Sequence, residues 1–135
     1  MNTTYWIDRI MKLAYRTGTN DVYVGLSSSA PNPDGTGVTE PSGGGYSRAH
    51  LLYFSEPSNG EVHNTEPVIF PPSVAQWFSD ETPATHWCLF NGKSATAPLL
   101  SAGSLDEPMS IRKDVTIRIP IGGISITLVD AQEVT

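Results

Sequence analysis

The sequence predicts a mainly β protein: an antiparallel β-sandwich, jelly-roll-like, with one short N-terminal helix. Three observations support this fold class. Apolar runs are short, and turn residues separate them at intervals of about 8–12 residues, as in sandwiches and jelly rolls. Two runs near the C-terminal end alternate apolar and polar side chains, which is the period of a half-buried strand. In addition, 12 Gly and 11 Pro among 135 residues divide the chain into short elements.

The length of 135 residues is that of one domain and is sufficient for a hydrophobic core. We therefore expect a single β-sandwich domain over residues 1–135. The N-terminal helix should lie within residues 1–17 and the sandwich within residues 21–129.

Residues 3–15 have the period of an amphipathic helix, with polar residues before it to cap its start and Gly18 to end it. An apolar stripe of this width must pack against something. We therefore expect the stripe to be buried against the protein's own sheet or against another subunit, and its candidate interface residues are Trp6, Ile10 and Leu13.

The segments that follow favour strands and turns. Residues 21–26 and 46–54 are rich in strand formers, and the Pro/Gly/Ser-rich loop 27–37 lies between them. The further expected elements are a turn at Asn59-Gly60, short strands at 62–64 and 68–70, one helical turn within 71–78, a central strand at 85–92 buried on both faces, and a weak strand at 98–103.

Residues 115–121 and 124–129 alternate in polarity, and Gly122-Gly123 lies between them. Two alternating runs joined by a Gly-Gly pair predict a β-hairpin. Pro120 cannot donate to a strand ladder, so the first strand should lie at a sheet edge or end there.

The three glycines at 43–45 predict a structural turn that redirects the chain into the next strand. A dinucleotide-type phosphate loop would need the spacing G-x-G-x-x-G and a helix after it, whereas apolar strand formers follow Gly45. We therefore assign Gly43, Gly44, Gly45, Tyr46 and Arg48 to a structural turn.

Composition restricts the possible partners. The formal net charge is −6, from 8 Lys and Arg against 14 Asp and Glu, so the chain lacks the basic footprint of a nucleic-acid-binding protein. No apolar run is long enough to cross a membrane, and the first residues lack the layout of a secretory signal. A single cysteine, Cys88, allows no internal disulfide and is compatible with a reducing cytoplasm.

None of the motifs that resemble reactive sites is complete. Gly92-Lys93-Ser94 would end a Walker motif, but Trp87 stands where the motif needs glycine. His86 and Cys88 share a strand face without further ligands, and residues 32–37 only partly resemble a calcium loop. The acidic pairs at 80–81 and 106–107 are typical of solvated loops. We expect no catalytic residue, no metal, no cofactor and no enzyme activity.

The aromatic residues allow two interpretations. They either fill the core and a subunit interface or include a sugar-stacking platform, and bulk burial is the more common role. The residues concerned are Trp6, Tyr46, Tyr53, Trp77, Phe78 and Trp87.

Several segments together resemble a phage protein family. In "VYVGLSSSAPNPDGTGVTEPSGGGYSR" (22–48), the pattern Glu-x-Ser-Gly-Gly-Gly-Tyr-x-Arg falls at residues 40–48. "NGEVHNTEPVIFP" (59–71), "ATHWCLFNG" (84–92) and "LLSAGSLDEPMSI" (99–111) follow in order, with Asn91 where Asp is frequent. Over about residues 21 to 129 the chain resembles the tail fibre and minor tail protein family, the mycobacteriophage gp80-like group, found in phages and prophages of Gram-positive bacteria.

The resemblance implies a bacteriophage virion structural protein, made in the host cytoplasm and associated with the tail, fibre or baseplate. It implies partners among other virion proteins, a homo-oligomer that phage symmetry would make a trimer or hexamer, and no enzyme activity or cofactor. The alternatives are a capsid (head) decoration protein and a carbohydrate-binding module that binds a host surface glycan.

Overall fold

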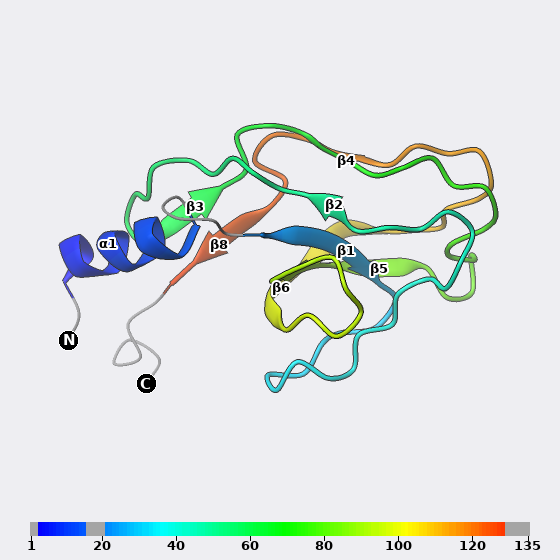
Figure 1. Ribbon diagram of the computed structural model, residues 1–135, viewed down its shortest axis with the longest axis horizontal. Helices are drawn as coiled ribbons and strands as arrows, with labels where there is room; N and C mark the ends of the chain where they lie inside the picture. Colours follow the sequence, from blue (N-terminus) through cyan, green and yellow to red (C-terminus); the bar gives the residue numbers. More distant parts are fainter. Residues whose placement is uncertain (1–2, 16–20, 129–135) are drawn as a thin grey trace. The chain divides into compact units, whose positions relative to one another are not determined.

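The computed structural model describes residues 3–15 and 21–128, and within them the protein is mainly β with one short helix, as predicted (Figure 1). The elements are α1 (Thr4–Tyr15), β1 (Tyr23–Ser27), β2 (Ala49–His50), β3 (Glu61–His63), β4 (Val68–Ile69), β5 (Ala84–Phe90), β6 (Leu99–Met109), β7 (Arg118–Ile119) and β8 (Ser125–Thr127). Every strand pair is antiparallel. The closure of these sheets into a jelly-roll sandwich stays a prediction.

The contacts of the chain gather in two compact units. Residues 1–20, 52–67 and 120–135 form one unit, here called the helix unit, and residues 21–51 and 68–119 form the other, here called the sheet unit. The helix unit contains α1, β3 and β8, and the sheet unit contains the remaining strands. The single domain expected from chain length stays a prediction.

The sheet unit is built around a four-stranded sheet in the order β2-β1-β5-β6. β5 pairs with β1 from Tyr23↔Phe90 to Ser27↔His86 and with β6 on its other side. Four successive residues of β5, from Trp87 to Phe90, are buried, so both faces of this strand are covered. The central strand predicted at 85–92 is therefore confirmed, because an unbroken apolar run satisfies both faces of an inner strand.

β6 forms one edge of that sheet and extends well beyond the weak strand predicted at 98–103. The register between β5 and β6 shifts between Ala84 and His86 and again between Leu89 and Phe90. Gly103 pairs with Trp87, and a side chain at 103 would collide with the indole ring. The glycine thus allows the buried tryptophan to cover the neighbouring strand.

The helix unit packs α1 against β3, and β3 pairs with β8. Met11 is the buried residue of the helix, and the Tyr15 ring lies 5.0 Å from the ring of Phe54. Asp8 accepts a hydrogen bond of 2.6 Å from the backbone N–H of Gly60. Asn59 and Gly60 both have positive φ, which confirms the predicted turn between Ser58 and Glu61.

The helix is confirmed, but the predicted stripe is not the side that packs within its own unit. Burial of the stripe against another subunit stays a prediction. Trp6 and Leu13 are 47% and 57% exposed, and Ile10 is only partly buried. The side facing the unit is instead centred on Met11. Periodicity identifies an amphipathic helix, but it does not select between two adjoining apolar faces when both satisfy the spacing.

The predicted C-terminal hairpin is wrong. β7 pairs with β4 and β8 pairs with β3, although Gly123 N does donate to Pro120 O in the expected turn. β7 ends at Ile119, in agreement with the break expected at Pro120. The fully buried Asn64 binds the main chain after this break: its Oδ1 accepts a hydrogen bond from Ile124 N at 3.0 Å. A distant amide side chain therefore redirects the second run toward β3.

Two further predictions gave more regular secondary structure than the protein has. Of the strand predicted at 46–54, only Ala49–His50 is a strand. The helical turn expected within 71–78 does not form, because its backbone N–H groups bond to distant carbonyls: Ser73 to Val115, Val74 to Gly44 and Trp77 to Ile111.

Within the described ranges, no helix is long and apolar enough to cross a membrane.

Candidate binding pocket and assembly surface

The triple-glycine turn sits in the sheet unit, ahead of β2. Gly43, Gly44 and Gly45 have φ values of 79°, 64° and 80°, and Tyr46 N donates to Gly43 O at 3.1 Å. Residues other than glycine rarely adopt such backbone angles. The carbonyl of Gly44 also accepts from Trp77 Nε1 at 2.8 Å, so the turn is tied to the core.

The polar residues that flank this turn converge on one carboxylate. Glu40 Oε2 accepts from the Tyr46 hydroxyl at 2.5 Å and from Arg48 Nε at 3.0 Å, and Glu40 Oε1 accepts from an Arg48 terminal nitrogen at 2.6 Å. The same guanidinium donates to the carbonyls of Gly92 and Ser94 at 3.2 and 2.7 Å. It also lies over the Phe90 ring, 3.4 Å from the centroid. We call Glu40, Tyr46 and Arg48 the polar cluster.

Arg48 is the buried member of the polar cluster, and Glu40 and Tyr46 are partly buried. The side chains of Arg48 and Glu40 are 5% and 17% exposed. Burial, and then the neighbouring Glu40, raise the pKa of Tyr46 far above its usual value, so its hydroxyl stays protonated and donates. A bidentate pair of this kind replaces the lost hydration with charge-assisted bonds. Arg48 therefore joins the segment 40–48 to the segment 92–94 through its bonds to the carbonyls of Gly92 and Ser94.

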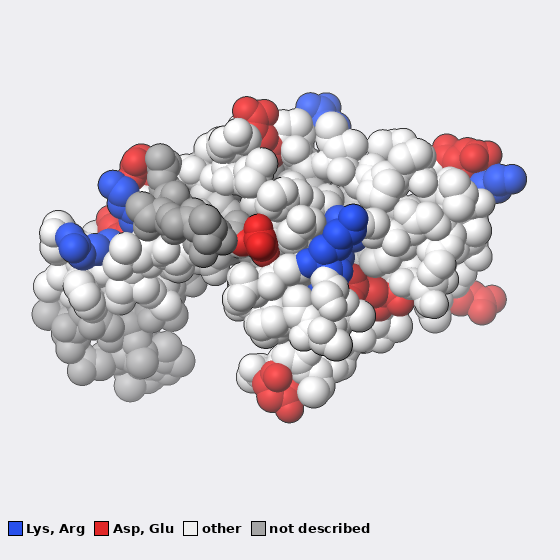
Figure 2. Space-filling view, in the orientation of Figure 1, with Lys and Arg blue, Asp and Glu red and all other residues white. Residues whose placement is uncertain are grey.

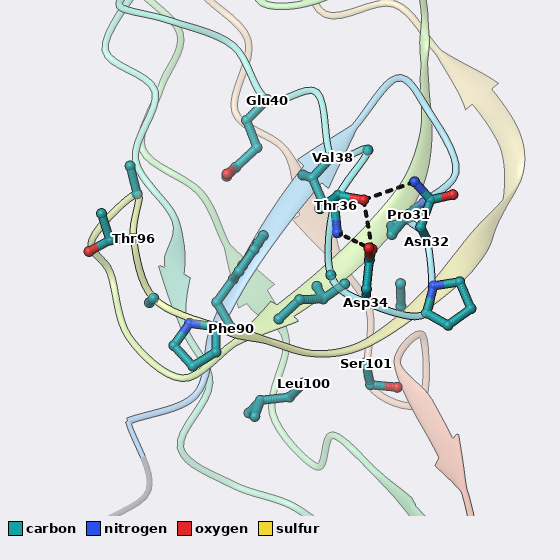
Figure 3. A pocket seen from close by; sticks show the side chains of 18 of the residues that line it. Pro31, Asn32, Asp34, Thr36, Val38, Glu40, Phe90, Thr96, Leu100 and Ser101 are labelled. Atoms are coloured by element: carbon teal, nitrogen blue, oxygen red, sulfur yellow. Dashed lines mark hydrogen bonds between the residues drawn. The ribbon is translucent and has the colours of Figure 1, made fainter.

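A pocket of about 750 Å³ opens beside the polar cluster, entirely within the sheet unit (Figure 3). One wall is the loop 31–38, and the other is the segment 95–102, which includes the start of β6. Phe90 and the Glu40–Arg48 pair also line it. Figure 3 shows Asn32, Asp34 and Thr36 gathered on one side of this space, with Thr96 on the opposite side.

Internal hydrogen bonds hold the first wall in shape. Asp34 Oδ1 accepts from the Thr36 backbone N–H at 3.0 Å and from its hydroxyl at 2.6 Å. Asn32 Nδ2 donates to Thr36 Oγ1 at 3.0 Å, and Gly35 N donates to Asn32 O at 2.9 Å. The bonds from Thr36 lower the pKa of the exposed Asp34 carboxyl. The segment that partly resembles a calcium loop is thus a hydrogen-bonded turn.

The residues singled out for metal or thiol chemistry do not assemble into a site. His86 is partly exposed on β5, whereas Cys88 is fully buried. Burial raises the pKa of the Cys88 thiol to about 12, so this thiol is protonated and unreactive at neutral pH. Among residues 3–15 and 21–128, no group of three His, Cys, Asp or Glu side chains is placed to hold a metal ion.

The aromatic residues are divided between core and surface. Trp77, Phe78 and Trp87 are buried, so none of them presents a face for sugar stacking. Trp6 and Tyr53 are exposed in the helix unit. Trp6 and Leu13, with the partly buried Ile10 between them, form an apolar stripe on α1, here called the helix stripe. On the face shown in Figure 2, charged residues stand in small groups among wide uncharged areas.

Sequence comparison gives the family of this protein. Residues 2–127 match the family described as Podophage GP4 fiber I protein gp80. No curated protein matches the sequence. The matched range includes the helix stripe, the glycine turn, the polar cluster and both walls of the pocket, and it covers almost the whole chain. The chain therefore belongs to this family of phage fibre proteins.

Proposed function

We propose that this phage fibre protein is a non-enzymatic structural component of the virion that acts by oligomeric packing with itself and with other virion proteins. The observation that carries the proposal is the helix stripe: Trp6 and Leu13 are about half exposed although they lie on a helix that is already packed through Met11. The family match supports a structural role in a phage fibre.

The helix stripe has the chemistry of an oligomer contact. Trp6, Ile10 and Leu13 lie at spacings of four and three residues, so they share one side of α1. Burying a tryptophan or leucine side chain stabilises a contact by about 1.5–3 kcal/mol each. Because the helix has its own buried contacts, the stripe is available for a second subunit.

The finer assignments belong to the same proposal. We place the protein in the tail, fibre or baseplate region of the particle, after synthesis in the host cytoplasm, as a trimer or hexamer in keeping with phage symmetry. An origin among mycobacteriophages or other phages of Gram-positive bacteria follows from the sequence resemblance. A capsid decoration protein would use the same packing at another place in the particle.

The test compares Trp6→Asp and Leu13→Asp with a matched control. The control is Leu52→Asp, because Leu52 is 58% exposed in the same unit but lies outside α1. Light scattering of the purified chain should give an oligomer for the wild type and for Leu52→Asp, and smaller species for both helix variants. Circular dichroism should show that the helix persists. Equal masses for all four proteins would overturn the proposal.

A further inference from the structure

We propose that Asn91-Gly92 is a site of spontaneous covalent modification, at which the asparagine loses its side-chain amide and becomes aspartate or isoaspartate. The two residues follow β5 directly, in the loop that leads to β6. This inference goes beyond the packing role and does not depend on the helix stripe, because both residues belong to the sheet unit.

The reaction needs only the chain and water. The backbone nitrogen of Gly92, after losing its proton to a base in solution, attacks the side-chain carbonyl carbon of Asn91. A new C–N bond closes a five-membered succinimide ring, the bond to the side-chain nitrogen breaks, and ammonia leaves. Water then opens either carbonyl of the ring, which gives aspartate or isoaspartate. Glycine is the most favourable residue after asparagine, because it has no side chain to hinder the attack and the widest range of backbone angles.

The hydrogen bond of the glycine N–H distinguishes the steps at which this reaction could occur. The sequence has three steps in which Asn or Asp precedes Gly: Asp34-Gly35, Asn59-Gly60 and Asn91-Gly92. At Asn59-Gly60, the N–H of Gly60 donates to Asp8 Oδ1 at 2.6 Å. A bond to a charged acceptor must break before the nitrogen can attack, which should slow the reaction about tenfold or more.

The step at Asp34-Gly35 is held in a similar way. The N–H of Gly35 donates to Asn32 O at 2.9 Å, so the attacking group is occupied. The Asp34 carboxylate accepts two hydrogen bonds from Thr36, so the target is occupied as well. An ionised carboxylate is also a poorer target for a nucleophile than an amide. We therefore expect little reaction at this step.

The step at Asn91-Gly92 differs from both. Asn91 is exposed, so water can reach its side-chain amide. Within residues 3–15 and 21–128, neither the Gly92 N–H nor the side chain of Asn91 takes part in a hydrogen bond. The attacking nitrogen and its target are therefore both available, and no bond has to break before they react.

An isoaspartate at position 91 would disturb the polar cluster. Its main chain runs through the former side chain, so the backbone before Gly92 becomes one carbon longer. Gly92 O accepts a hydrogen bond from Arg48 at 3.2 Å, and a longer backbone moves this carbonyl away from the guanidinium. The isoaspartate form, purified by ion exchange, should therefore unfold at lower urea concentration than Asn91→Asp, which adds the same charge to a normal backbone. Equal midpoints would contradict this effect.

The main experiment incubates the purified full-length chain at mildly alkaline pH and follows its peptides by mass spectrometry. Conversion of an amide to a carboxyl adds one mass unit, and fragmentation distinguishes isoaspartate from aspartate. In the folded chain, we expect Asn91 to convert about tenfold or more faster than Asn59. The reference is the same chain unfolded in guanidinium chloride. There the two rates should be similar, because glycine follows both asparagines and no folded structure holds either N–H.

Two variants test the cause. Asp8→Ala removes the acceptor of the Gly60 N–H, so conversion at Asn59 should become about tenfold faster while conversion at Asn91 stays the same. Asn91→Gln should stay unmodified at position 91 over the same period, because its longer side chain would have to close a six-membered ring. Circular dichroism and thermal melting confirm that both variants are folded.

Three results would overturn the proposal. The first is conversion of Asn91 in the folded chain that is no faster than conversion of Asn59. The second is an intact Asn91 in the folded chain after the unfolded chain has converted completely. The third is an unchanged rate at Asn59 in folded Asp8→Ala. Light scattering separates this proposal from the packing role, because a Trp6→Asp variant that no longer assembles should convert Asn91 at the wild-type rate.

Discussion

At the scale of single residues, the central feature is the Arg48 guanidinium. It pairs with Glu40 through two nitrogens, donates to two carbonyls and lies on the Phe90 ring. A planar group with five N–H donors can satisfy this arrangement, whereas an ammonium group cannot. The exposed pair Arg112–Asp80 is its opposite: the atoms are 3.8 Å apart and both side chains are 75% exposed.

This contrast gives the first prediction. Arg48→Met should lower the free energy of unfolding by about 3 kcal/mol, because Glu40 is left buried without its cation. Arg112→Met should change it by less than about 0.5 kcal/mol. Urea denaturation followed by tryptophan fluorescence measures both values. Similar losses in the two variants would contradict the role given to the polar cluster.

A second residue-scale prediction concerns Gly25, in the middle of β1. A methyl group there would lie 2.6 Å from Glu40 Oε2, 2.9 Å from the Phe90 ring and 3.0 Å from the Tyr46 hydroxyl. Gly25→Ala should therefore cost about 1–3 kcal/mol of stability through overpacking. Ser104→Ala, at an exposed position of β6, should stay within about 0.5 kcal/mol of the wild type in the same denaturation assay. If Gly25→Ala left the free energy of unfolding unchanged, the polar cluster would be able to shift and accommodate the methyl group.

At the scale of elements, α1 has two apolar sides that differ in exposure. Met11 is buried and Leu13 is exposed, although only two positions separate them. Met11→Ala should destabilise the helix unit by about 2–3 kcal/mol, and Leu13→Ala by less than about 0.5 kcal/mol in the monomer. Hydrogen exchange of the α1 amides in dilute protein measures the difference. Faster exchange in Leu13→Ala than in Met11→Ala would reverse the assignment of the two sides.

The comparison of predicted and observed elements shows which sequence signals were sufficient to predict the structure. The helix and the central strand β5 were predicted well, because a 3.6-residue period and an unbroken apolar run are local properties. The hairpin failed, since Asn64 binds Ile124 from 60 positions away and no local pattern records this contact. The turn at residues 43–45 was predicted from glycine chemistry. The pocket was not predicted, because only strand pairing brings residues 31–38 near residues 95–102.

At the scale of the whole molecule, alkaline pH should destabilise the fold. Burial raises the pKa of Cys88 from 9.0 to about 12, and it also raises the pKa values of Tyr15 and Tyr46 above 10.0. The unfolded chain then loses its protons at lower pH than the folded chain. The stability from these groups is complete below about pH 8 and is lost as the pH rises from there toward 12.

The measurement is the free energy of unfolding at pH 7, 8, 9 and 10. We expect a plateau to about pH 8 and a loss of about 1.4 kcal/mol from Cys88 by pH 10. Cys88→Ala should start from a lower plateau and decline less between pH 8 and 10, because the thiol no longer titrates. Stability that stays level or increases over this interval would contradict the buried, protonated thiol.

The helix unit draws on three stretches of the chain, residues 1–20, 52–67 and 120–135. β3 therefore has no strand partner until β8 has been synthesised, about sixty positions later. Folding from the N-terminus cannot complete this unit stepwise, because its last strand pair needs residues 125–127. A truncated product that stops before residue 124 would lack β8 and leave the hydrogen-bonding edge of β3 unpaired, so we expect it to be cleaved by proteases faster than the full chain.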